Sequence, residues 1–200
     1  MTNTPIHYRN MMAIRATNPS KKTWKGADEV KKLTTKKSGG YGEIVARDMV
    51  TEAGYTMLTG KDYTRINLTP LEQRCLRKNY YTSDGYIVEL DAHIESKMLL
   101  PNTSGTANEK LDGFLRKVKR YGKKCILLLG GEFELDTYSE SNAIQAGAGL
   151  LNTEMTNFYA DDMTALETAR LIKEGKLEVV KLSEFPMWLA TQKTKELAAK

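Results

Sequence analysis

The strongest constraint on the fold is a pair of short apolar runs between residues 80 and 99. Tyr80–Val88 and Ala92–Leu99 each have the length and composition of a β-strand. Only Glu89–Asp91 separate them, which leaves room for a turn and nothing longer. The sequence therefore predicts two adjacent strands joined by a tight turn.

Charged residues occupy defined positions in these two strands. Side chains alternate between the faces of a strand, so Glu95 and Lys97 share one face of the second strand. Asp84 lies on the strand before it. Two carboxylates of this kind can hold Mg²⁺, while the nearby lysine orients or deprotonates a water and stabilises negative charge. These residues together indicate hydrolysis of a phosphodiester bond.

The segment Lys61–Asn79 is predicted to be an insertion that contains one helix. Thr69, Pro70 and Glu72 match the capping-box pattern, with the threonine as N-cap and the glutamate three residues later. Other periodic segments predict an α/β chain with a mixed sheet flanked by helices. The expected helices lie at about residues 44–53 (ended by Gly54), 108–121, 164–174 (capped by Thr164) and 184–197, and the expected strands at 55–58, 125–129 and 177–182.

Composition narrows the class of protein. The sequence has no apolar run of the roughly 20 residues that a membrane span needs, and its two cysteines, Cys75 and Cys125, lack metal-site spacing. We therefore expect a cytoplasmic protein that does not enter a membrane. The net charge is +5, and residues 1–40 carry nine Lys or Arg against two acids, whereas residues 134–190 carry ten acids against four bases. This distribution favours an anionic partner for the first part of the chain.

Asp84, a gap of ten residues and then Glu95-x-Lys97 resemble the PD-(D/E)XK nuclease superfamily, which includes restriction and homing endonucleases. The likeness covers roughly residues 40–130. Glu43 stands in a helix before the first core strand, where many members place a further acidic residue. The residues 104–124 resemble the loop and helix that follow the site, and Cys125–Leu129 fall where the fourth core strand would run.

The resemblance implies a restriction-endonuclease-like core at residues 40–133, with the insertion at 61–79. Residues 1–39 would be a basic arm, and residues 134–200 an extension for dimer contacts or DNA recognition. It implies Mg²⁺, replaceable by Mn²⁺, bound by Glu43, Asp84 and Glu95, with Lys97 as the fourth catalytic residue. Double-stranded DNA is the expected substrate, and a homodimer the expected assembly. The basic residues expected to contact DNA are Arg74, Arg77, Lys78, Lys110, Lys117 and Lys123.

Several alternatives stay open at this level. Asp91 competes with Asp84 as first ligand, although only three residues separate it from Glu95, and we place it in the turn. His93 shares the face of Glu95 and is either structural or part of the site. A Holliday-junction resolvase, an inactive DNA-binding protein with the nuclease fold and an unrelated basic RNA-binding protein are the competing functions.

Overall fold

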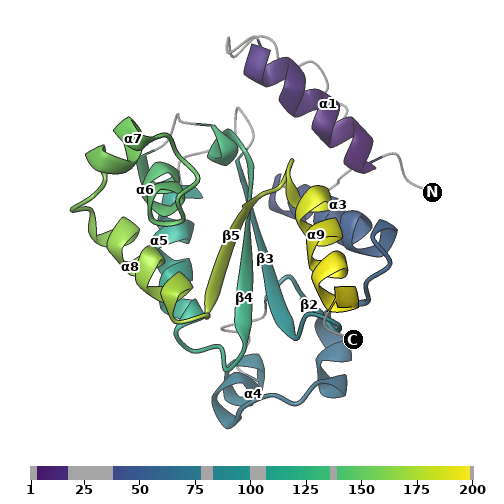
Figure 1. Cartoon of the computed structure of the whole chain (residues 1–200). Coiled ribbons are helices and arrows are strands. Elements are labelled where there is room, and N and C mark those ends of the chain that lie inside the picture. The colour runs from purple at the N-terminus through teal and green to yellow at the C-terminus, as the bar shows by residue number, and fades with distance from the viewer. Residues whose placement is uncertain (1–3, 18–37, 78–82, 100–106, 136–138, 199–200) are drawn as a thin grey trace.

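The computed structural model of the protein describes residues 4–17, 38–77, 83–99, 107–135 and 139–198 (Figure 1). Its centre is a five-stranded mixed sheet in the order β1-β2-β3-β4-β5. The first three strands are antiparallel neighbours, and β3, β4 and β5 run parallel. The strands are β1 (Met57–Leu58), β2 (Gly85–Ile87), β3 (Ala92–Leu99), β4 (Lys124–Gly131) and β5 (Leu177–Lys181). The α/β class with a mixed sheet flanked by helices is thus confirmed.

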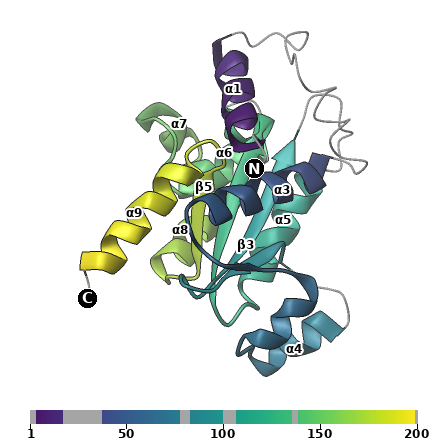
Figure 2. The same ribbon diagram turned by 90° about the vertical axis from the view of Figure 1, so that its right-hand side faces the viewer.

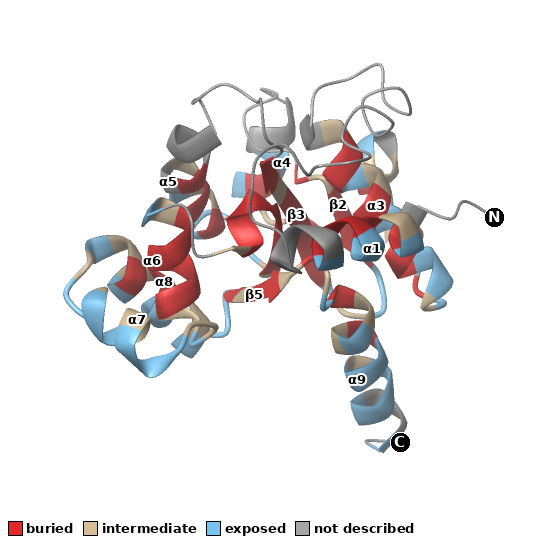
Figure 3. Cartoon of the chain, turned by 90° about the horizontal axis from the view of Figure 1, so that it is seen from above, coloured by how far each residue is buried: buried red, intermediate tan, exposed pale blue. Residues whose placement is uncertain are grey.

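Helices cover both faces of this sheet. In Figure 1, α5, α6 and α8 lie on one side of the strands, and α3 and α9 lie on the other. Each side has its own apolar core, and Figure 3 shows the strands buried between the two layers. The helices are α1 (Thr4–Thr17), α3 (Ser38–Glu52), α4 (Pro70–Arg77), α5 (Ala107–Val118), α6 (Ser139–Gly147), α7 (Thr153–Phe158), α8 (Met163–Lys173) and α9 (Phe185–Ala198), with the 3₁₀ helices η2 (Gly60–Arg65) and η3 (Glu132–Glu134). Among the described helices, none combines the length and the apolar character that a bilayer span requires.

The predicted antiparallel strand pair forms around the expected turn, although its first strand is shorter than expected. β2 and β3 are antiparallel, with Gly85 opposite Ile94, and Asp91 occupies the turn with a φ of 47°. Ile94 and Met98 belong to the core beneath α3. Glu95 is registered with Leu127 of β4, which belongs to the core beneath α5. The charged face of β3 is therefore the α5 face.

The insertion helix α4 begins as its sequence predicts. The Thr69 N–H donates to Glu72 Oε2 at 2.8 Å, and the Glu72 N–H donates to Thr69 Oγ1 at 3.2 Å. This is the reciprocal bonding of a capping box. Figure 2 shows α4 beyond one end of the sheet, opposite the end that carries α1.

Two predictions from the sequence differ from the structure, the N-cap of α8 and the length of β2. Asp162, and not Thr164, caps α8: its carboxylate accepts the N–H groups of Thr164 at 2.8 Å and Ala165 at 3.1 Å. Asp162 is the residue just before the helix, where its carboxylate can reach two free N–H groups of the first turn, whereas Thr164 already lies inside that turn and is one of the donors. The expected strand over residues 80–88 is shorter, because β2 covers only Gly85–Ile87 and residues 80–82 lie outside the described residues.

The segments on either side of the predicted core also contribute to this architecture. Tyr8 of α1 is fully buried against the α3 side of the sheet. The boundary expected at residue 133 falls inside η3, and the chain beyond it supplies β5. The division into arm, core and extension stays a prediction.

A buried carboxylate connects α1 to the sheet. Tyr8 donates its hydroxyl hydrogen to Glu134 Oε1, and the same hydroxyl oxygen accepts the Gly131 N–H at 2.9 Å. Ser183 adds its N–H at 3.1 Å and its hydroxyl at 2.5 Å to the two oxygens of Glu134. Burial raises the pKa of Glu134 to about 7, although hydrogen bonds from Ser183 and Tyr8 oppose the increase.

We expect Tyr8→Phe to destabilise the protein, because it leaves the Gly131 amide and one oxygen of Glu134 short of a partner inside the core. The loss should be about 1–3 kcal/mol, or a fall in Tm of roughly 3–8 °C for a chain of this size. Tyr41→Phe is the matched control, since the Tyr41 hydroxyl is buried without a hydrogen-bond partner among the described residues. Thermal melts in which both variants lose the same stability would contradict this role of Tyr8.

Candidate active site

Glu95 and Lys97 meet on the charged face of β3. The Lys97 ammonium donates to Glu95 Oε1, and Lys117 of α5 brings a second ammonium to 3.9 Å from the same oxygen. The Glu95 side chain is only 3 % exposed. A carboxylate this deep needs cations or donors around it, and two lysines from different elements supply the charge.

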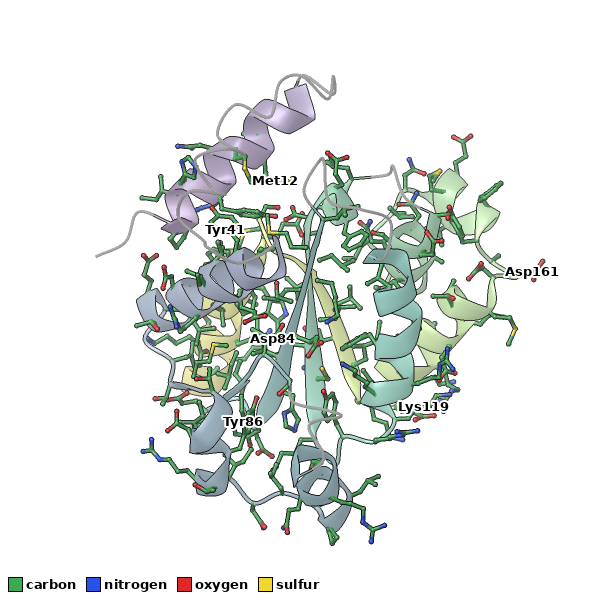
Figure 4. All side chains as sticks on the ribbon, turned by 180° about the vertical axis from the view of Figure 1, so that it is seen from behind. Met12, Tyr41, Asp84, Tyr86, Lys119 and Asp161 are labelled. Atoms are coloured by element: carbon green, nitrogen blue, oxygen red, sulfur yellow. The ribbon has the colours of Figure 1, made fainter. Side chains whose placement is uncertain are left out.

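Asp84 approaches from the neighbouring strand. It precedes Gly85, the first residue of β2, and its Oδ2 accepts the backbone N–H of Ser96 at 2.6 Å. The carboxylate thus accepts a backbone N–H of β3 at a point where a longer β2 would have paired with that strand. Figure 4 labels Asp84 over the sheet and Tyr86 farther toward α4.

Burial raises the pKa of Asp84 to about 7, and the negative charges of Glu95 and Glu43 add to the increase. Lys97 and the Ser96 amide oppose it. Two carboxylates in one desolvated place resist simultaneous ionisation unless positive charge arrives. The site is therefore predisposed to accept a cation.

Lys97 is a cation in this arrangement. Burial alone would lower the pKa of Lys97, but the charges of Glu95 and Asp84 outweigh that effect and raise it above the ordinary value. Of the three roles expected for Lys97, orienting a water and stabilising negative charge fit an ammonium. Deprotonation of the water does not fit, because an ammonium has no free electron pair.

The donor set suits a hard cation with hydration water. Glu95 Oε2 is buried and has no hydrogen-bond partner among the described residues, so one carboxylate oxygen is available on the site face. Mg²⁺ is commonly held by one or two carboxylates together with water and substrate oxygens. Asp84 and Glu95 meet that requirement.

Glu43 stands farther out. Within the described ranges, no three His, Cys, Asp or Glu side chains form a group that could hold an ion, so Glu43 does not join Asp84 and Glu95 at one point. Its carboxylate is exposed on α3, yet its charge contributes to the pKa of Asp84. The neighbouring Gly42 explains the closeness of α3 to β3: a Cβ there would lie 2.6 Å from Ser96 Oγ.

Asp91 lies apart from this cluster. Its side chain is 67 % exposed in the turn and pairs with Lys123 at 2.6 Å. The Tyr86 hydroxyl also donates to Asp91. This agrees with the prediction that Asp91 belongs to the turn, and it gives Lys123 a partner on the hairpin.

The expected DNA-contacting residues fall in different places. Arg74 is exposed on α4, and Lys117 lies at the site itself, beside Glu95. Lys78 and the side chains of Arg77 and Lys110 lie outside the described residues. A role for these residues in binding DNA stays a prediction.

His93 shares the face of Glu95 but is held by other partners. Its Nε2 lies 2.8 Å from Glu72 Oε1, and its Nδ1 lies 3.0 Å from Ser83 Oγ. From the sequence, Glu72 was predicted only as part of the helix cap, and Ser83 was assigned no function. The available signal was a buried-strand histidine with a serine directly before Asp84, but no spacing rule joins α4 to β3.

Comparison of the chain with protein-family models, with curated proteins and with solved structures finds no match.

We expect Asp84→Asn to stabilise the protein in alkaline conditions. The folded-state pKa of Asp84 is raised above its unfolded value of about 3.9, so ionisation costs stability as the pH rises from about 4 through 7. An asparagine keeps an acceptor for the Ser96 N–H without that cost. Tm should rise by roughly 3–6 °C at pH 8 and by much less at pH 4.

Asp91→Asn is the control for this measurement, because the raising effect of burial on the pKa of Asp91 is outweighed by the bonds from Lys123 and Tyr86, so that the pKa is lowered. Its substitution should leave Tm at pH 8 unchanged or slightly lower. Equal stabilisation by both substitutions would show a general effect of net charge.

Proposed function

We propose that this protein is a Mg²⁺-dependent endonuclease that hydrolyses double-stranded DNA, of the restriction or homing type within the PD-(D/E)XK superfamily. One observation carries the proposal: Asp84 from the edge of β2 and Glu95 and Lys97 from β3 converge on one desolvated face. The unpartnered oxygen of Glu95 and the raised pKa of Asp84 both favour a bound cation there.

The order of elements gives independent support. The chain runs from α3 through the antiparallel strands β1, β2 and β3, then through α5 to the parallel strand β4. The superfamily resemblance implies this succession: a helix with an acidic residue, the strands that carry the site, a following helix and a fourth core strand. Gly42 allows the helix that carries this acidic residue, Glu43, to pack closely on β3, and the charge of Glu43 contributes to the raised pKa of Asp84.

In the proposed reaction, a water oxygen forms a bond to phosphorus and the bond from phosphorus to the leaving sugar oxygen breaks. Asp84 and Glu95 would hold Mg²⁺, which neutralises phosphate charge and makes a bound water more acidic. Lys97 orients the attacking water and donates hydrogen bonds to phosphate oxygens whose negative charge grows. The water loses a proton to solvent, and the leaving oxygen gains one.

The two-stranded substrate suggests a symmetric dimer, with one site acting on each strand. Mn²⁺ should replace Mg²⁺, since both accept oxygen ligands. Lys117 provides positive charge beside Glu95, and Arg74 provides exposed positive charge on α4.

Incubation with plasmid and genomic DNA tests the proposal. We expect cleavage with Mg²⁺, none with EDTA, and a loss of roughly 10²–10³-fold or more in Lys97→Ala and Lys97→Met, with DNA binding retained. Lys176→Ala, which removes an exposed lysine paired with Glu174, is the control and should cut normally. Metal-independent cutting or full activity without Lys97 would contradict the mechanism.

The same experiment distinguishes the alternative functions. Preference for branched DNA over a discrete sequence would indicate a resolvase. DNA binding without cleavage would indicate an inactive protein with the nuclease fold.

A second comparison separates catalysis from DNA contact on α5. We expect Lys117→Ala to lower kcat by roughly tenfold or more with little change in KM, because its ammonium lies 3.9 Å from Glu95. Lys119→Ala is the matched variant, since Lys119 lies just beyond the end of α5 and instead pairs with Glu167 at 2.7 Å. A backbone contact alone would raise KM and leave kcat unchanged, and that result for Lys117 would remove it from the catalytic group.

A further inference from the structure

A hydrogen-bond network behind Asp84 begins in the insertion helix α4. Glu72 Oε1 lies 2.8 Å from His93 Nε2, and His93 Nδ1 lies 3.0 Å from Ser83 Oγ. All three residues are buried. Ser83 directly precedes Asp84, so the network ends at the stretch of backbone that carries the proposed metal ligand.

Each member of this network has additional support. The Tyr121 ring stacks on the His93 ring with centroids 4.5 Å apart. The Tyr63 hydroxyl lies 2.7 Å from Ser83 Oγ and 2.9 Å from the Ser83 carbonyl oxygen. With contacts to its side chain and to its backbone, Ser83 is restrained in position and orientation.

The two carboxylate oxygens of Glu72 have different partners. Oε1 faces His93, and Oε2 accepts the backbone N–H of Thr69 at 2.8 Å. Burial would raise the pKa of Glu72, but the bonds from His93 and Thr69 outweigh it and lower the pKa to about 2. Glu72 is therefore ionised at neutral pH. The capping box that starts α4 also supplies the charge that holds His93.

The connectivity of Ser83, His93 and Glu72 is that of a hydrolytic triad, but Ser83 is poorly placed to be a nucleophile. It is 6 % exposed, and its hydroxyl lies between Tyr63, His93 and the Gly85 carbonyl oxygen, to which it donates at 3.0 Å. The hydroxyl is thus engaged by three protein groups. Positioning explains these contacts better than attack.

We propose that Glu72, His93 and Ser83 are positioning residues that hold the Asp84 carboxylate against the edge of β3. The Asp84 carboxylate is removed from water and repelled by the negative charge of Glu95. Both effects favour movement of this side chain away from its position beside β3. Its bond to the Ser96 N–H at 2.6 Å persists only if the preceding residue is fixed. The network supplies that restraint from α4.

The inference rests on the proposed function in one respect, which is that Asp84 binds the metal. Residues that orient metal ligands typically change metal affinity by about 10–100-fold when replaced. The position of Asp84 can also be measured without metal, through the Ser96 amide that it covers.

Hydrogen exchange of the Ser96 N–H in metal-free protein is the first test. We expect Glu72→Ala and Ser83→Ala to accelerate this exchange tenfold or more. Thr69→Ala, which loses the cap of α4 but keeps the Glu72–His93 contact, should change it less than twofold at a similar loss of Tm. Glu72→Gln keeps an acceptor oxygen for His93 and should restore most of the protection, even where Glu72→Ala folds poorly.

Calorimetric titration with Mn²⁺ is the second test. Wild type should bind, Asp84→Asn should not, and Glu72→Ala and Ser83→Ala should bind about 10–100-fold more weakly. Unchanged Ser96 exchange in both variants overturns the positioning role, whether or not Mn²⁺ binds. Faster Ser96 exchange in a protein that binds no Mn²⁺ supports the positioning role and overturns the proposed function instead.

Discussion

The burial of a charged strand face constrains the rest of the structure. β3 is almost wholly buried, yet one of its faces carries His93, Glu95 and Lys97. Ionised groups removed from water are tolerated only with close partners. The partners come from three other elements: Lys117 from α5 and Glu72 from α4 contact this face, and Asp84 from the edge of β2 binds the strand's backbone.

The parallel pairing of β3 with β4 makes this convergence possible. Parallel neighbours need a crossover connection, and α5 provides it, so that Lys117 returns over the face that holds Glu95. The short β2 leaves the Ser96 amide to a side chain instead of a neighbouring strand. Where the backbone pairing of β2 with β3 stops, the Asp84 side chain replaces it.

Local patterns predicted the parts of the site that belong to one stretch of chain. The turn at Asp91, the shared face of Glu95 and Lys97 and the capping box at Thr69 each depend on neighbours a few residues apart. The contact of His93 with Glu72 and that of Tyr8 with Glu134 depend on distant segments meeting in space.

No periodicity in the sequence encodes such meetings. A glutamate that caps a helix looks the same whether its second oxygen faces water or a buried histidine. For the same reason the sequence predicted Lys117 only as a DNA-contacting residue, and the crossover geometry brings it to Glu95.

Asp84 and Glu134 are two buried carboxylates with similarly raised pKa values, and their partners distinguish a candidate site from a structural contact. Burial raises the pKa of both Glu134 and Asp84 to about 7, so the shift alone does not distinguish them. Donors from Tyr8 and Ser183 occupy both oxygens of Glu134, which leaves nothing for a ligand to add. Beside Asp84, Glu95 keeps a buried oxygen that meets no donor among the described residues. An arrangement that leaves a desolvated carboxylate oxygen unpaired next to a second carboxylate is costly in the free protein, and under the proposed function a bound cation would remove that cost.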